Sequence, residues 1–211
     1  MRKLVYENRI KESFKKLYPE DTLYPSEICH CLRRSILARR IEHIKNLTSE
    51  VLDYGLAIHE DVETYFKEKL GCETEKAIEY EIEGVKISAR VDLLCGSDLL
   101  ELKTVSHFIR QPYQDHIVQV SLYHHILSQL GYKIDNVYII YINRQNYDVQ
   151  EFKIQKDQLE QGLKSAIDFI KNYKKYKDEQ NIFKIPTGDS TFCKNCEFKN
   201  ICYGSLDVFL K

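Results

Sequence analysis

The sequence predicts an α/β protein in which helices flank a mixed, partly antiparallel sheet. Apolar residues keep helical spacing from Val51 to Leu70, and two segments of alternating apolar and polar residues follow, Ile78 to Ile82 and Val85 to Val91. The chain has 211 residues, which suffice for one sizeable core but are few for two full domains. We therefore expect residues 1–211 to form a single domain.

Composition excludes several classes of protein. Apolar residues make up 43% and charged residues 30%, with only 8 Gly and 4 Pro, which excludes disordered and collagen-like chains. The longest apolar run, residues 137–142, is far shorter than the roughly 20 residues of a membrane span, and residues 1–17 lack a secretory apolar segment. We expect a cytoplasmic protein with no membrane partner. The net charge of -1 neither demands nor excludes nucleic acid.

Caps and apolar spacing predict the helices, which cover residues 3–17, 26–43, 49–70, 112–130 and 157–176. Ser26 and Ser49 are expected N-caps, and Gly71 suits a C-terminal cap. Asp157 with Glu160 has the spacing of a capping box at the start of the last helix. The residues from 182 onward form a cysteine-bearing tail.

Alternation and turn residues predict the strands, which cover residues 78–82, 85–91, 99–105, 137–143 and 147–154. Glu83-Gly84 and Gly96-Ser97 are the expected hairpin turns.

A pair of carboxylates gives the sharpest functional signal. A two-residue loop at Gly96 would place Asp92 opposite Glu101 and Arg90 opposite Lys103, with all four side chains on one face. Opposed like charges destabilise a sheet, so these two carboxylates call for a cation, and oxygen ligands suit Mg²⁺ or Mn²⁺. The alternative is a solvated ladder of ion pairs. The apolar residues around both acids favour the metal site.

These residues resemble the core of the PD-(D/E)XK nucleases, with Val91 in place of the motif's proline. His59 and the Gln119–Tyr123 pair are similar to the RecB-like branch of that superfamily. The resemblance implies a restriction-endonuclease-like core, with metal ligands and reaction residues at these positions: His59, Asp92, Glu101 and the main-chain carbonyl of Leu102 for the metal, and Asp92, Glu101, Lys103, Gln119 and Tyr123 for catalysis. By composition alone other histidines are equally available: His107, His116, His124 and His125.

Seven cysteines in a chain expected to be intracellular argue against a disulfide framework and for metal-binding thiols. Cys193-x-x-Cys196 followed by Cys202 supplies three thiolates, and a four-ligand site needs one more. Cys31 is the expected fourth ligand and Cys29 the alternative. Cys72 and Cys95 fall near predicted turns and are expected to be bystanders. Spacing does not separate zinc from an iron–sulfur cluster, and buried structural thiols are the other alternative.

Cys31 with the arginines after it, and the late cysteine set, resemble the CRISPR-associated nucleases of the Cas-four family. That resemblance implies a [4Fe–4S] cluster that joins residues 26–43 to residues 182–211. It also implies action on single-stranded DNA ends beside CRISPR integration proteins.

The leading hypothesis is a metal-dependent DNA nuclease, expected to be a single-strand exonuclease, with endonucleolytic cleavage left open. The basic residues of the second helix could track the phosphate backbone: Arg33, Arg34, Arg39 and Arg40. The alternative hypotheses are a non-catalytic subunit that binds DNA or a partner, and a zinc-stabilised interaction module. The sequence leaves the polarity of digestion, the oligomeric state, and a host or viral context open.

Overall fold

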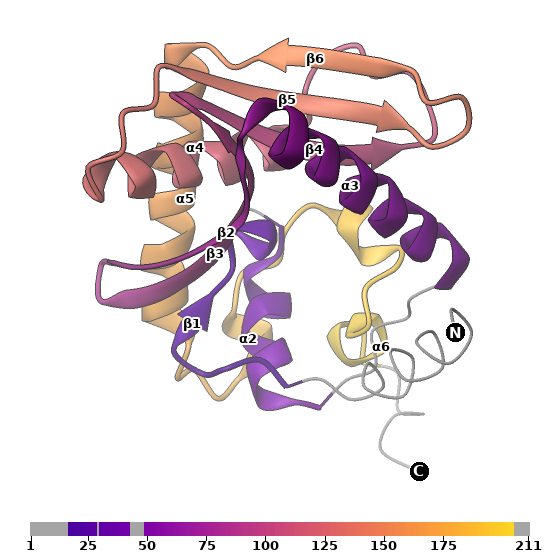
Figure 1. The fold of residues 1–211 in the computed structure, drawn as a ribbon. Helices are drawn as coiled ribbons and strands as arrows, with labels where there is room; N and C mark the ends of the chain where they lie inside the picture. The colour runs from indigo at the N-terminus through magenta and orange to yellow at the C-terminus, as the bar shows by residue number, and fades with distance from the viewer. Residues whose placement is uncertain (1–16, 29, 43–48, 205–211) are drawn as a thin grey trace.

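The computed structural model describes residues 17–28, 30–42 and 49–204, and Figure 1 shows them in colour. The helix predicted over residues 3–17 lies outside them except for Leu17. Cys29 lies outside them as well.

One mixed six-stranded sheet forms the centre of the fold, in the order β1-β3-β4-β5-β6 with β2 also paired to β3. Its strands are β1 (Thr22–Leu23), β2 (Glu73–Ile82), β3 (Val85–Cys95), β4 (Asp98–Val105), β5 (Asn136–Asn143) and β6 (Val149–Lys153). β4 and β5 are parallel, as are β1 and β3, and the other pairs are antiparallel. The predicted mixed sheet is confirmed.

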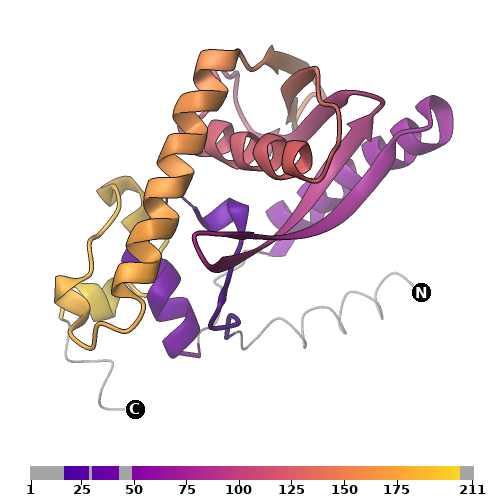
Figure 2. The same cartoon turned by 90° about the vertical axis from the view of Figure 1, so that its left-hand side faces the viewer.

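Helices cover both faces of this sheet: α3 (Ser49–Leu70) on one, α4 (Gln114–Gln129) and α5 (Lys156–Tyr176) on the other (Figures 1 and 2). Ile58 of α3 packs against Leu100 and Leu102 of β4 in one buried cluster. A larger cluster joins α4 and α5 to the opposite face. Alternation along β4 explains this, since successive side chains point to opposite faces.

Both predicted hairpins are present. Glu83 and Gly84 have φ of 54° and 74°, the left-handed pair that a two-residue hairpin turn requires. At the second hairpin, Cys95 pairs with Asp98.

The helix predicted over residues 26–43 is shorter than expected. Ser26 lies inside a 3-10 turn, η1 (Pro25–Glu27), and α2 (Leu32–Arg40) begins only after Cys31. Proline fixes the first turn, and the Glu27 carboxylate accepts the Tyr24 N–H at 2.8 Å, so the chain forms a separate turn before extending.

The start of α5 also differs from the prediction. Its N-cap is Gln155, whose backbone N–H donates to the Gln158 side chain at 2.9 Å. The predicted capping box of Asp157 and Glu160 is therefore wrong by two residues.

The tail contains three short elements, η2 (Ile182–Lys184), η3 (Ser190–Cys193) and α6 (Lys199–Cys202). Figure 1 shows it beside α2, and Phe198 is buried there with Leu37 and Ala38. Within the described ranges, no helix has the length and apolar character to cross a membrane.

Candidate active site

The candidate active site lies where one edge of β3 has no neighbouring strand. β2 pairs with β3 along residues 85–94, so β1 and β4 must share the other edge of β3. On that edge β1 pairs with Lys86 and Ile87, and β4 pairs from Leu93 onward. The described strands leave residues 88–92 without a partner there. Four of these residues line a cleft of about 1290 Å³: Ser88, Ala89, Arg90 and Asp92.

Asp92 lies where the two strands separate. The β3–β4 register is the predicted one, but the ladder ends at Leu93 and Leu100, one pair short of Asp92 and Glu101. The two carboxyl groups still lie close together, and besides burial the Asp92 charge raises the pKa of Glu101. The Asp92 carboxylate instead accepts the backbone N–H of Leu102 at 2.8 Å. The Leu102 N–H has no partner in the β3–β4 ladder and would otherwise be buried without a hydrogen bond. The Asp92 side chain supplies the missing acceptor.

Arg90 is also placed differently from the prediction. Its guanidinium forms a 2.7 Å ion pair with Glu75 of β2 and is largely exposed, so it does not pair across the hairpin with Lys103. The four charged side chains therefore do not form one continuous ladder, although all four line the cleft.

Glu101 is 1% exposed and has two donors on one oxygen. Its Oε1 accepts from Lys103 Nζ at 2.6 Å and from Gln119 Nε2 at 2.7 Å. Its Oε2 is buried and has no hydrogen-bond donor among the described residues. Burial raises the pKa of Glu101, the Lys103 charge lowers it, and the Asp92 charge raises it. An unpartnered buried carboxylate oxygen beside a second acid fits a divalent cation.

The Lys103 amine contacts both Glu101 and Gln119. Burial alone would lower the pKa of its amine, but the Glu101 carboxylate raises it, so the amine stays charged. Lys103 Nζ also donates to Gln119 Oε1 at 3.1 Å. Gln119 Nε2 in turn donates to the Tyr123 hydroxyl at 2.8 Å, one helical turn further along α4. The structure therefore brings together the predicted lysine, glutamine and tyrosine.

Three potential ligands meet on the α3 side of the cleft. Ligand atoms of His59, Glu63 and Asp92 lie within 4.8 Å of one another. Burial lowers the pKa of His59, which favours the neutral imidazole that binds metals. Burial, with the charges of Glu75 and Asp92, raises the pKa of Glu63 to about 7.

Glu63 is the residue that sequence reasoning missed. Its Oε1 is buried without a hydrogen bond in the described structure and lies 4.0 Å from His59 Nδ1. The available signal was spacing, because an acid four residues after His59 shares its face of a helix.

All four arginines that were predicted to bind DNA form hydrogen bonds or ion pairs within the protein. Arg33 and Arg39 are each 8% exposed. Arg33 donates to the Ile185 carbonyl at 2.8 Å, and Arg39 pairs with the buried Glu27 at 2.6 Å. A phosphate-tracking role for these two is wrong, because their guanidinium groups face the interior.

Arg34 pairs with Glu197 of the tail at 2.8 Å, and Arg40 donates to the Glu179 carbonyl at 2.7 Å. Both side chains are more accessible than those of the other two arginines. Contact of Arg34 and Arg40 with DNA remains a prediction.

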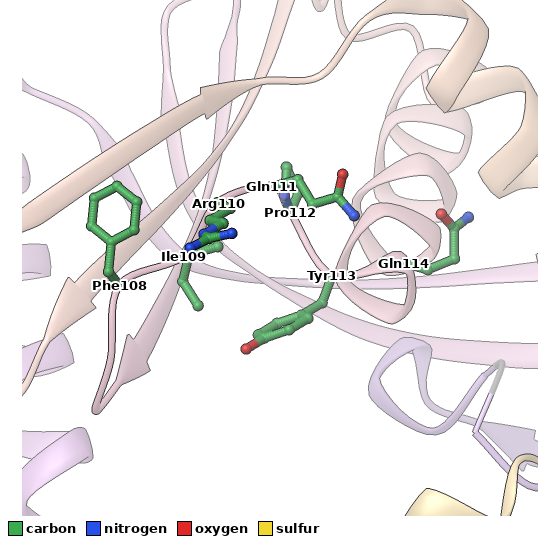
Figure 3. A pocket seen from close by; sticks show the side chains of 7 residues that line it. All are labelled: Phe108, Ile109, Arg110, Gln111, Pro112, Tyr113 and Gln114. Carbon is green, nitrogen blue, oxygen red and sulfur yellow. The ribbon is translucent and has the colours of Figure 1, made fainter.

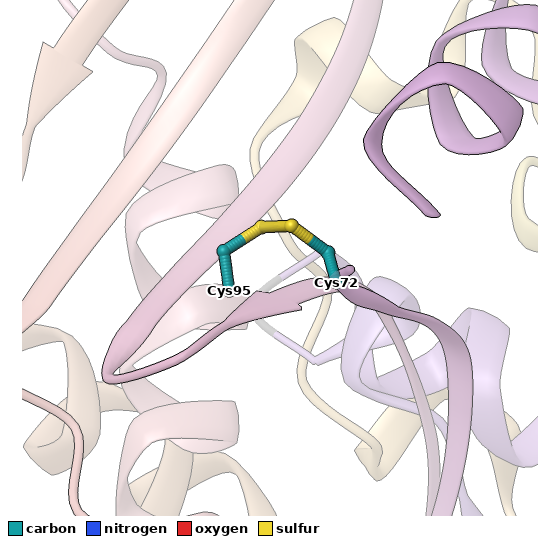
Figure 4. The surroundings of a disulfide bond; sticks show 2 residues. All are labelled: Cys72 and Cys95. Carbon is teal, nitrogen blue, oxygen red and sulfur yellow. A yellow bond between two sulfur atoms is a disulfide. The ribbon is translucent and has the colours of Figure 1, made fainter. Parts of the chain in front are cut away.

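The cysteines divide into two groups. Cys72 and Cys95 form a disulfide, so they are bystanders to the predicted metal site as expected, but the argument against disulfides fails for this pair (Figure 4). β2 begins at Glu73, which pairs with Leu94, so the register sets Cys72 opposite Cys95. The predicted strand began at residue 78 and hid this pairing.

The other described cysteines carry free, partly buried thiols: Cys31, Cys193, Cys196 and Cys202. Burial raises the pKa of Cys202, and the charges of Cys31 and Cys193 raise it further, so these three thiols lie near one another. The charge of Cys202 likewise raises the pKa of Cys196, which is also raised by burial.

Comparison with known proteins gives the family of this chain. The crystal structure of SSO0001 superposes with a TM-score of 0.66 at 19% identity, covering 97% of each chain. A putative exonuclease from Eubacterium rectale superposes with a TM-score of 0.50 at 16% identity, covering 72% of this chain and 59% of that one. No curated protein matches. A sequence model of the PD-(D/E)XK nuclease superfamily matches residues 8–203, and the chain belongs to that superfamily.

Proposed function

We propose that this protein is a divalent-metal-dependent DNA nuclease that degrades single strands from their ends. Membership of the superfamily supports metal-dependent phosphodiester cleavage. The observation that carries the proposal is the buried, unpartnered Oε2 of Glu101, in one cleft with Asp92 and His59. A carboxylate oxygen without a donor is costly to bury unless a cation takes that place.

The donor set suits Mg²⁺ or Mn²⁺. His59, Asp92, Glu101 and the Leu102 carbonyl would hold the ion, and Glu63 is near enough to join them. The Leu102 carbonyl follows from strand geometry. The N–H and C=O of one strand residue face the same side, and the Leu102 N–H already faces Asp92.

A bound divalent ion would polarise the scissile phosphate and lower the pKa of an attacking water. Lys103 carries a positive charge beside Glu101 and would stabilise the negative charge that develops on the phosphate. Gln119 fixes both Lys103 and Glu101, and Tyr123 anchors Gln119. These two residues therefore position the amine and the acid.

The preference for DNA ends rests on two supports. The sequence resembles the RecB-like branch, which implies exonucleolytic action on single strands. The putative exonuclease from Eubacterium rectale shares the fold. Endonucleolytic cleavage by the same cleft is compatible with this chemistry.

We propose that Cys31, Cys193, Cys196 and Cys202 hold a [4Fe–4S] cluster. Four cysteines suit zinc as well as an iron–sulfur cluster, and the resemblance to the Cas-four family supports the iron–sulfur cluster. The cluster would join residues 26–43 to residues 182–211, and contacts such as the Arg34–Glu197 ion pair support that arrangement.

The Cas-four resemblance suggests CRISPR spacer acquisition, or more general DNA end processing, as the context. If the CRISPR context is right, the protein should co-purify with CRISPR integration proteins expressed beside it.

A strand-polarity assay tests the nuclease. With Mn²⁺, the purified protein should degrade single strands labelled at either end, and Asp92→Ala should abolish this. Glu151→Ala is the matched control, because Glu151 is an exposed acid on β6. Full activity of Asp92→Ala would refute the site. Anaerobic purification should give a brown protein containing iron, whereas a colourless protein containing zinc would refute the cluster.

A further inference from the structure

One wall of the active-site cleft carries a pair of aromatic rings. His30, in the segment before α2, and Phe192, in η3 of the tail, lie 4.6 Å apart between ring centroids, at 58°. Both side chains are partly exposed, and both line the cleft that contains Glu101 and Lys103. The tail therefore contributes a ring to the active site in addition to its cysteines.

The structure fixes this pair in place. His30 Nε2 lies 3.6 Å from the Asp115 carboxylate, at the start of α4. The tail backbone is pressed against the same segment, since a Cβ added to Gly188 would lie only 1.9 Å from the His30 carbonyl oxygen. Two elements far apart in sequence thus present adjoining aromatic rings to the cleft.

The Lys103 side chain lines the same cleft as the His30–Phe192 pair and His59. Its charge also lowers the pKa of His30 and that of His59, although burial is the larger cause for both. A nucleotide whose phosphate lies at Lys103 would therefore have the His30–Phe192 pair within the same cleft.

We propose that His30 and Phe192 form a base-stacking subsite that holds an unpaired base next to the reacting phosphate. This inference rests on the proposed nuclease function and deepens it by naming what selects single strands. Base stacking on aromatic rings is tolerant of sequence, and it requires a base whose face is free. Bases within a duplex are already stacked on their neighbours and do not offer that face.

Binding without added divalent metal tests the subsite apart from cleavage. The probes are a fluorescent single-stranded oligonucleotide and the same oligonucleotide with abasic sites at its last three positions. The wild type should bind the intact strand about tenfold more tightly. Phe192→Leu and His30→Leu should each lose this difference, whereas Phe192→Tyr should keep it because it retains a ring.

A matched control is Phe108→Leu. Phe108 is 74% exposed and lies in a separate hollow formed by residues 108–114, shown in Figure 3, so its loss should leave the preference intact. With Mn²⁺, Phe192→Leu should raise KM about tenfold with little change in kcat. Visible absorbance of each variant reports whether the tail has kept its metal group.

The outcomes separate the two proposals. A wild type that cleaves no single strands would contradict the nuclease itself. A wild type that cleaves them, with Phe192→Leu and His30→Leu retaining the preference for intact bases, would overturn the stacking subsite alone. Loss of the preference in Phe108→Leu, but not in Phe192→Leu, would also overturn it and place base recognition in the other hollow.

Discussion

The Asp92 carboxylate accepts the Leu102 backbone N–H at 2.8 Å, at the point where β3 and β4 separate. Leu102 is fully buried, so this donor has little access to water. One oxygen of the Asp92 carboxylate therefore bridges the two strands by this hydrogen bond. The other oxygen does not take part in it and can face the cleft.

This arrangement predicts different effects for two substitutions of Asp92. Asp92→Asn keeps an oxygen for the Leu102 N–H and should leave the free energy of unfolding within about 1 kcal/mol of the wild type. Asp92→Ala leaves a buried donor unpaired and should cost about 1–3 kcal/mol. Urea denaturation measures the difference. Both variants should lack Mn²⁺-dependent cleavage, and wild-type cleavage by Asp92→Asn would contradict a metal-binding role.

Gln119 is predicted to act by positioning. Gln119→Ala removes a donor to Glu101 and an acceptor for Lys103, and should lower kcat about 10- to 100-fold. Tyr123→Phe should have a smaller effect, because Gln119 keeps its contacts with Glu101 and Lys103. Gln129→Ala, at the exposed end of α4, is the control. Equal kcat values for Gln119→Ala and Gln129→Ala would rule out the positioning role.

The raised pKa of Glu63 leads us to predict that metal binding depends on pH. Its pKa, raised to about 7, means that much of it is protonated near neutral pH and must lose that proton to bind a cation. The Mn²⁺ affinity, measured by titration calorimetry, should therefore rise between pH 6 and pH 8. Glu63→Gln should flatten part of this rise, because the pKa of Glu101 is raised to about 8 and that ligand also loses a proton in this range. An unchanged pH dependence in that variant would exclude Glu63 as the source.

The raised pKa of Glu63 also predicts how the stability of the metal-free protein changes with pH. Because the pKa is higher in the folded state than the ordinary 4.5, the folded state binds more protons than the unfolded state between these values. The wild type should therefore lose stability relative to Glu63→Gln as pH rises from about 4.5 through 7. The two stability curves, measured without metal, should diverge in that direction.

The sequence predicted the sheet, both hairpins and the helices α3, α4 and α5, because periodicity and turn residues are local signals. It did not predict the separation of β3 from β4, which depends on β1 taking part of the same edge. From the sequence alone, backbone pairing beyond a hairpin is assumed to continue along both strands. Here the Asp92 side chain takes the Leu102 N–H at the point where the pairing ends, and no local sequence pattern reveals this.

The residues that the motifs single out line one cleft, whereas features that depend on packing were missed. Arg33 and Arg39 look like a basic surface in the sequence, but each hydrogen-bonds to groups from distant segments in the interior. The Cys72–Cys95 pairing likewise needed the full length of β2.

Arg39 is predicted to matter for stability and not for DNA binding. Its removal in Arg39→Leu leaves the buried Glu27 carboxylate without its partner and should cost about 3–5 kcal/mol. Arg40→Ala removes only solvent-exposed hydrogen bonds, to the Lys177 and Glu179 carbonyls, and should cost about 1 kcal/mol or less. Thermal denaturation compares the two. A specific loss of DNA affinity in Arg39→Leu, with unchanged stability, would restore the phosphate-binding interpretation.

The Cys72–Cys95 disulfide connects the end of α3, which carries His59 and Glu63, to the end of β3, which carries Asp92. It closes a loop with a sequence separation of 23, so its removal should lower the free energy of unfolding by about 3 kcal/mol through the entropy of the unfolded chain. The double variant Cys72→Ala/Cys95→Ala, measured by urea denaturation without reductant, tests this. Adding reductant to the wild type should produce the same loss and leave the double variant unchanged. If the reductant destabilises both proteins equally, the loss comes from the tail thiols and not from this bond.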